Sequence, residues 1–126
     1  MRLLIVDDSN MIRTRISRVV QSGGLTGVVL AGLAKNGREA VRLARATRPE
    51  VVTMDLTMPE MDGIECIGEL LRFDPKINIL VVSALSDKST AIQALRLGAR
   101  GFVAKPFTDE ELQMALLDVA DNSREL

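Results

Sequence analysis

Histidine is absent from the 126 residues of this chain. Without an imidazole, the chain cannot build a histidine-containing catalytic triad, a histidine-ligated zinc or haem site, a histidine general base or a phosphohistidine carrier. The single cysteine, Cys66, has no partner for an internal disulfide, which favours a reducing, intracellular compartment.

Neither sign of charge is in excess, because 16 Lys and Arg stand against 17 Asp and Glu. Proteins that bind nucleic acids usually carry a basic excess that neutralises phosphates, so the composition argues against such a partner. No apolar run approaches the roughly 18 residues of a membrane span, and the first six residues do not resemble a signal peptide. We therefore expect a cytoplasmic protein that binds neither nucleic acid nor membranes.

The length and the hydrophobic content of 47% predict one domain over residues 1–126, structured over about 2–120 and ending in a polar tail at 121–126. Short apolar segments, expected to be strands, lie at 3–6, 28–30, 51–54, 79–82 and 102–103. Apolar residues recur at helical spacing around 12–20, 40–44, 64–71, 91–95 and 112–120. Continuous apolar strands alternating with helices predict an α/β fold with a parallel sheet covered on both faces.

Local signals support several of the expected boundaries. A capping side chain followed three residues later by Glu marks three helix starts, at Asn36, Asp62 and Thr108. Gly98 stands where a residue with positive φ would end the fourth helix. The pair Gly23-Gly24 is interpreted as a turn.

In a parallel α/β sheet the ligand site lies beyond the carboxyl ends of the strands. The side chains at those ends are Asp7, Asp8, Asp55, Ser83 and Lys105. Two carboxylates about 4 Å apart repel by roughly 4 kcal/mol at an effective dielectric near 20, so three of them favour a bound cation. A set of oxygen ligands without histidine or thiolate favours Mg²⁺, and Lys105 adds a second positive charge.

A carboxylate next to Mg²⁺ and a lysine can act as a covalent nucleophile toward phosphorus. Asp55 is the best candidate acceptor because it ends the central strand and precedes an irregular loop. Thr57, in that loop, could offer its backbone carbonyl to the metal. This arrangement predicts phosphoryl transfer, which depends mainly on positioning and electrostatics.

Each of these residues also has a purely structural interpretation. An Asp pair at a strand–helix junction often caps the helix, and a serine that ends a strand is common in turns, so Ser83 has the weakest independent case. Ser9 is assigned to helix capping, since nothing here would activate its hydroxyl. Cys66 is expected to be a buried small side chain, and the methionines near Asp55 are expected to pack in the core.

Four separated motifs carry a resemblance to a known family. They are Ile5-Val6-Asp7-Asp8-Ser9, Met54-Asp55-Leu56-Thr57-Met58-Pro59 with Asp62-Gly63, Ser83-Ala84, and the stretch from Gly98 to Phe107 that includes Lys105-Pro106. Together they resemble the receiver domain of two-component response regulators, in its stand-alone chemotaxis type, over about residues 2–120. The resemblance implies a flavodoxin-like (βα)5 sandwich with strand order 2-1-3-4-5.

The resemblance also implies the roles of individual residues. Asp55 would be the phosphoacceptor, Asp7 and Asp8 would serve Mg²⁺, and Thr57 would lend its carbonyl to the metal. Lys105 would bond a phosphoryl oxygen, and its peptide bond to Pro106 would be cis. Ser83 would be the switch hydroxyl that turns toward the phosphoryl group, and Phe102 the aromatic ring that rotates inward when Ser83 moves.

Two positions vary within the family, two residues beyond the acceptor and two beyond the switch hydroxyl. They are Thr57 and Leu85 here, and Leu85 cannot position a hydrolytic water. The expectation is therefore slower self-dephosphorylation than in a Leu85→Glu variant. Phe102 lacks the hydroxyl of the tyrosine that many members have, although its ring can still be buried.

Three functions compete. The first is a signalling switch that catalyses its own phosphorylation and dephosphorylation but turns over no external substrate. The alternative is a haloacid-dehalogenase-like Mg²⁺-dependent phosphatase with Asp55 as nucleophile, which would want an acid where Thr57 stands. A flavodoxin fits less well, because Asp7 and Asp8 would repel a phosphate.

The resemblance to receiver domains also implies partner proteins. A receiver takes its phosphoryl group from a phosphohistidine, which this chain cannot make, so the donor is expected to be a sensor histidine kinase or a histidine phosphotransfer protein. The downstream protein is expected to bind the face formed by the fourth helix, the fifth strand and the fifth helix.

Overall fold

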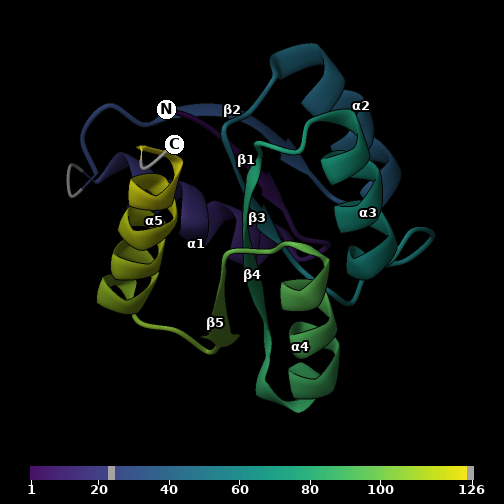
Figure 1. Ribbon diagram of the computed structural model, residues 1–126. Coiled ribbons are helices and arrows are strands. Elements are labelled where there is room, and N and C mark those ends of the chain that lie inside the picture. The colour runs from purple at the N-terminus through teal and green to yellow at the C-terminus, as the bar shows by residue number, and fades with distance from the viewer. Residues whose placement is uncertain (23–24, 125–126) are drawn as a thin grey trace.

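Five parallel strands form one central sheet in the order β2-β1-β3-β4-β5 (Figure 1). The strands are β1 (Arg2–Val6), β2 (Val29–Ala34), β3 (Val51–Met54), β4 (Asn78–Ala84) and β5 (Gly101–Lys105). This computed structural model describes residues 1–22 and 25–124, so the turn predicted at Gly23-Gly24 lies outside the described residues. The predicted fold class and strand order are confirmed.

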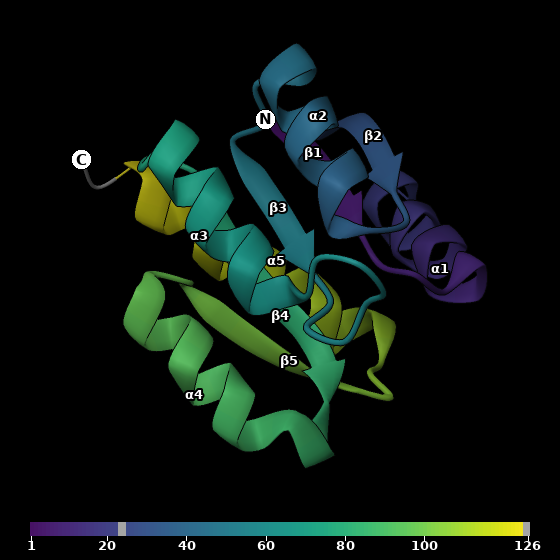
Figure 2. The same ribbon diagram turned by 90° about the vertical axis from the view of Figure 1, so that its right-hand side faces the viewer.

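Helices cover both faces of the sheet. On one face lie α1 (Asn10–Gln21) and α5 (Asp109–Arg124), and on the other lie α2 (Gly37–Thr47), α3 (Gly63–Phe73) and α4 (Lys88–Leu97). A single turn of 3₁₀-helix, η1 (Leu85–Asp87), leads from β4 into α4. Figure 2 shows α2, α3 and α4 side by side in front of the sheet.

The core consists of two apolar layers separated by the sheet. In β1, Leu4 and Val6 pack into the layer beneath α2, α3 and α4, whereas Leu3 and Ile5 pack into the layer beneath α1 and α5. All four side chains are at most 1% exposed. Burial of each such side chain stabilises the fold by about 1.5–3 kcal/mol, which is why the strands are apolar throughout.

The predicted caps are confirmed. A backbone N–H three residues on donates to each capping side chain: Asn36 (2.8 Å), Asp62 (2.9 Å) and Thr108 (3.1 Å). In the last case Glu111 also accepts a hydrogen bond from the Thr108 N–H at 2.9 Å, completing a capping box. Gly98 follows α4 with a φ of 127°, which a residue with a Cβ rarely adopts.

Several elements extend further than the sequence indicates, among them β4, which spans Asn78–Ala84 where 79–82 is expected. β2 continues through Ala31 and Gly32, which favour strands poorly, because pairing with β1 holds the backbone extended. β5 likewise includes Gly101 and Ala104, which pair with β4. Helix α5 runs to Arg124, four residues past the expected boundary at Ala120 and into the predicted polar tail.

Candidate phosphoryl-transfer site

The carboxyl ends of β1 and β3 bring three acidic side chains together. The two strands are neighbours, with Val6 opposite Met54, so Asp7 and Asp55 follow paired positions. Asp7, Asp8 and Asp55 each offer a carboxylate oxygen, and these oxygens lie within 4.8 Å of one another. The sequence-based prediction of a three-acid cluster therefore agrees with the geometry.

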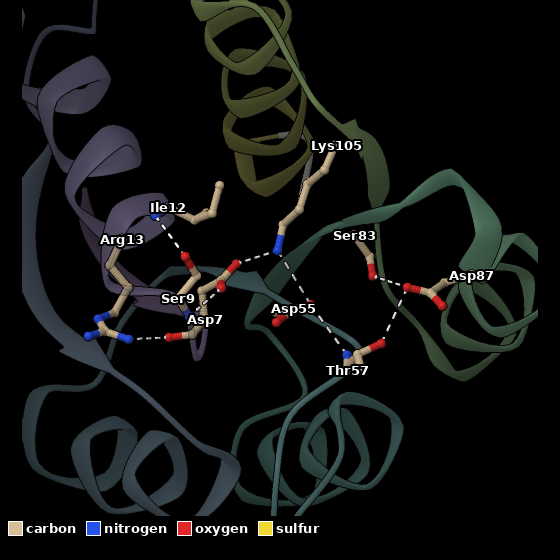
Figure 3. A network of polar contacts seen from close by, with 9 residues as sticks. All are labelled: Asp7, Ser9, Ile12, Arg13, Asp55, Thr57, Ser83, Asp87 and Lys105. Atoms are coloured by element: carbon tan, nitrogen blue, oxygen red, sulfur yellow. Dashed lines mark hydrogen bonds and ion pairs between the residues drawn. The ribbon is translucent and has the colours of Figure 1, made fainter.

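Asp7 is fixed by contacts on both carboxylate oxygens. Its Oδ1 accepts a hydrogen bond from the Ser9 N–H at 2.9 Å, and its Oδ2 accepts one from Lys105 Nζ at 2.7 Å (Figure 3). The guanidinium of Arg13 donates to the Asp7 carbonyl at 2.6 Å. Asp7 is only 1% exposed, so the Ser9 N–H and the Lys105 ammonium take the place of water around its carboxylate. Ser9 itself caps α1, as predicted, by accepting from the Ile12 N–H at 3.3 Å.

Lys105 connects the fifth strand to the acidic cluster. Its Nζ lies 2.7 Å from Asp7 Oδ2 and 3.6 Å from Asp55 Oδ1, with the side chain 21% exposed. Lys105 ends β5 opposite Ala84 of β4, and its peptide bond to Pro106 is cis, as the resemblance implies. One ammonium group thus contacts two of the three acids.

Asp55 is buried to 4% exposure, and its pKa is raised from 3.8 to about 7. Burial is the largest cause, because it removes water from the charged form, and the negative charge of Asp7 acts in the same direction. The charge of Lys105 and the Thr57 N–H, which donates to Asp55 Oδ1 at 3.3 Å, lower the pKa in part. A further cation beside Asp55 would therefore stabilise the ionised form of its carboxyl group.

Beside Asp55, two hydroxyl groups meet on a single carboxylate oxygen. Ser83, at the end of β4, donates to Asp87 Oδ2 at 2.9 Å, and Thr57 donates to the same oxygen at 3.3 Å (Figure 3). Asp8, Asp55, Ser83, Asp87 and Lys105 line one surface pocket together with Thr57. Four of the five strand-end residues predicted from the sequence therefore line one pocket, and the fifth, Asp7, is buried beside it and contacts Lys105.

The donor set fits a small hard cation. The three acidic side chains offer carboxylate oxygens, two of them buried and the third, Asp8, exposed to solvent, and the Thr57 carbonyl is a fourth candidate oxygen ligand. Mg²⁺ is held in proteins by one or two carboxylates plus waters, which an open cluster of this kind allows. The acidic cluster can therefore bind a metal ion, with Asp8 at the solvent side.

Other predicted residues lie outside the acidic cluster. Phe102 is half-buried in β5 and packs against the core layer beneath α2, α3 and α4. Leu85, at the start of η1, is 64% exposed. Cys66 is buried, and burial raises the pKa of its thiol to about 12, so the predicted structural role fits better than a reactive one. Met54 and Met58 are buried in the core, as expected.

Two residues of the site were not singled out from the sequence. Asp87 precedes a helix, where an aspartate is ordinarily interpreted as a cap, and Arg13 is one of many charged residues on a helix surface. Their contacts depend on how the loops return to the sheet. Ser83 belongs to a strand, so the helical i, i+4 pairing rule does not apply to it, and the sequence carries no signal for its contact with Asp87.

The sequence model of the response regulator receiver domain matches residues 3–117 of this chain, so the chain belongs to the family of response regulator receiver domains. The chain is 40% identical to the chemotaxis protein CheY of Thermotoga maritima, over 94% of this chain and 97% of that protein. It is 37% identical to the chemotaxis protein CheY of Bacillus subtilis, over 91% of this chain and 93% of that protein.

A solved structure leads to the same family. The chain matches CheY in the CheX-CheY-BeF3-Mg²⁺ complex of Borrelia burgdorferi with a TM-score of 0.87 at 30% identity, covering 95% of this chain and 89% of that one. CheY-like receiver domains are signalling switches that work with kinases or phosphotransfer proteins. The haloacid-dehalogenase alternative finds no support in these comparisons. Among the described residues, no helix is long and apolar enough to cross a membrane.

Proposed function

We propose that Asp55 accepts a phosphoryl group from a phosphohistidine on a separate sensor histidine kinase or histidine phosphotransfer protein, in a Mg²⁺-dependent reaction. The observation that carries the proposal is the position of Asp55, buried between the acidic pair and a lysine ammonium 3.6 Å away. The class of reaction is inferred from the family, and the residues that carry it are inferred from the geometry of this site.

In the proposed reaction, an ionised Asp55 carboxylate oxygen forms a bond to phosphorus as the phosphorus–nitrogen bond of the donor breaks. The electron pair of that bond stays on the imidazole, which takes up a proton. Because the pKa of Asp55 is raised to about 7, a cation beside the carboxylate helps to keep it ionised at neutral pH. Mg²⁺, held by Asp7, Asp8, Asp55 and the Thr57 carbonyl, would neutralise charge on the phosphoryl oxygens.

Lys105 and Ser83 complete the proposed site from the neighbouring strands. Lys105 would bond a phosphoryl oxygen, since its ammonium already contacts Asp7 and Asp55. Ser83 would turn its hydroxyl toward the phosphoryl group. The change would reach the surface through Phe102, which lies on the strand paired with that of Ser83.

The proposed output surface is formed by α4, β5 and α5. Its helices expose large apolar side chains to solvent: Ile92 (45%), Leu95 (43%), Met114 (66%) and Leu117 (47%). Exposed apolar side chains on these helices would give a protein partner apolar surface to bury. The names of the relatives suggest chemotaxis as the pathway, and the cytoplasm is the location that fits the proposal.

Incubation with Mg²⁺ and acetyl phosphate or phosphoramidate tests the proposal. The expected product is one acid-stable, hydroxylamine-labile phosphoryl adduct per chain, absent in Asp55→Asn and absent when Mg²⁺ is chelated. Steady multiple turnover of phosphate esters without an adduct would refute the switch and favour a phosphatase.

Self-dephosphorylation is the second proposed activity. Leu85 is exposed beside the pocket but has no polar atom with which to hold a water. We expect a Leu85→Glu variant to lose its adduct faster than the wild type after the phosphodonor is removed. An unchanged decay rate would contradict the role assigned to this position.

A further inference from the structure

We propose that Asp87 is a positioning residue that holds the Ser83 and Thr57 hydroxyls in the unphosphorylated state and thereby opposes phosphorylation of Asp55. The inference rests on the proposed role of Asp55 as phosphoacceptor. The three side chains, Asp87, Ser83 and Thr57, are called the Asp87 latch below.

The Asp87 latch joins the β3–α3 loop to the stretch formed by β4 and the adjoining η1. Asp87 Oδ2 accepts from Ser83 Oγ of β4 at 2.9 Å and from Thr57 Oγ1 of the β3–α3 loop at 3.3 Å. Ser83 is 1% exposed and Asp87 is half-buried, so water competes only in part for the Ser83 bond, whereas Thr57 is exposed and its longer bond is open to water. In Figure 3 the Ser83 hydroxyl points toward Asp87.

Helix capping does not account for this placement of Asp87. The residue occupies the N-cap position of α4, yet its side chain makes no capping hydrogen bond to the helix. The cap residues of α1, α2 and α3 all accept such a bond. The Asp87 carboxylate instead lines the same pocket as Asp8 and Asp55, where it adds a third acidic side chain.

The consequence follows from the number of hydrogens available. A hydroxyl has one hydrogen to donate, and an ionised carboxylate can only accept. While Ser83 donates to Asp87, it cannot donate to a phosphoryl oxygen on Asp55. Phosphorylation of Asp55 therefore requires the Ser83 hydroxyl to exchange the Asp87 carboxylate for a phosphoryl oxygen as its hydrogen-bond acceptor. Since the bond to Asp87 exists only in the unphosphorylated state, it favours that state.

The test measures the affinity for beryllofluoride, a phosphoryl mimic, at saturating Mg²⁺ by calorimetry. Asp87→Ala removes the competing acceptor and is expected to bind the mimic roughly tenfold more tightly, since one charge-assisted hydrogen bond of about 1.4 kcal/mol corresponds to that factor. Asp87→Asn, which is nearly isosteric but a weaker acceptor, is expected to lie between Asp87→Ala and the wild type. Phosphorylation by acetyl phosphate should accelerate in the same order.

A double-mutant cycle separates the latch from a simple change of charge. In a Ser83→Ala, Thr57→Val background the two hydroxyls are gone, so Asp87→Ala should no longer tighten binding. Glu110→Gln removes one negative charge from an exposed position in α5 and should not reproduce the gain.

The outcomes are distinct. If the wild type binds no beryllofluoride and forms no adduct, the proposed role of Asp55 fails. If the wild type binds beryllofluoride, and both Asp87→Ala and Asp87→Asn bind it only as tightly as the wild type does, the latch alone is refuted. An equal gain in both backgrounds would also refute the latch, because it would arise from charge and not from the hydroxyls.

Discussion

Replacing Asp55 by asparagine should stabilise the metal-free protein at neutral and alkaline pH. The pKa of Asp55 is raised from 3.8 to about 7 in the folded chain, mainly by burial and then by the charge of Asp7. Between these two values the folded state keeps a proton that the unfolded chain releases. The free energy of unfolding therefore falls as the pH rises through this window, by up to about 1.4 kcal/mol per pH unit.

The magnitude follows from the size of the shift. A displacement of about three pK units corresponds to about 4 kcal/mol if the folded site does not relax, and we expect about 2–4 kcal/mol with relaxation. The loss is complete above about pH 7, where both states are ionised. Asparagine has nearly the same shape as aspartate but carries no charge. In the variant Lys105 keeps its ion pair with Asp7, which is 2.7 Å long in the wild type.

Urea denaturation in EDTA, repeated from pH 4 to pH 8, provides the assay. The difference in unfolding free energy between Asp55→Asn and the wild type should be small near pH 4 and grow to its full value near pH 8. Glu110→Gln controls for the loss of one unit of surface charge. Two curves that stay parallel across this range would refute the reasoning. Added Mg²⁺ should stabilise the wild type at pH 8 more than the variant.

Three further substitutions have definite expected outcomes. Lys105→Met leaves the buried Asp7 carboxylate without its ammonium partner and should lower the unfolding free energy by roughly 1–3 kcal/mol in urea, while an unchanged value would contradict the ion pair. Thr53→Val should raise it by about 1 kcal/mol, because the buried Thr53 hydroxyl has no hydrogen-bond partner in the described part of the chain; a loss would indicate a hidden partner. Gly63→Ala would place a Cβ 2.5 Å from the Asp55 carbonyl and should both destabilise the fold and impair adduct formation. In the matched Gly68→Ala variant the new Cβ would meet only an arginine side-chain nitrogen at 3.9 Å, so the unfolding free energy should stay the same or rise. Equal losses of stability in the two variants would contradict the steric argument.

The sequence predicts most of the fold because its local signals agree with one another. Apolar strands, capped helices and the glycine after α4 all lie where the structure has them. Several element ends are exceptions, including the C-terminal end of α5. At the ends of β2 and β5, Gly32 and Ala104 have little strand preference of their own and are held by pairing with β1 and β4.

The site was predictable to the extent that topology determines it. Asp7 and Asp55 follow neighbouring parallel strands, so strand order places them together at one edge of the sheet. Lys105 ends β5, beyond β4, and its long side chain reaches both acids from there. Asp87 lies one turn of 3₁₀-helix beyond the end of β4. Its approach to Ser83 and Thr57 depends on the path of η1 and of the β3–α3 loop, which no periodicity in the sequence encodes.

The central claim, that Asp55 is the residue that carries the phosphoryl group, can be tested by locating the modification directly. After incubation with Mg²⁺ and acetyl phosphate, reduction with borohydride converts a phosphorylated aspartate to homoserine, which mass-spectrometric sequencing can assign to a position. The account predicts homoserine at residue 55 and at no other aspartate. Homoserine at position 7 or 8, or no conversion in a protein that binds Mg²⁺, would contradict it.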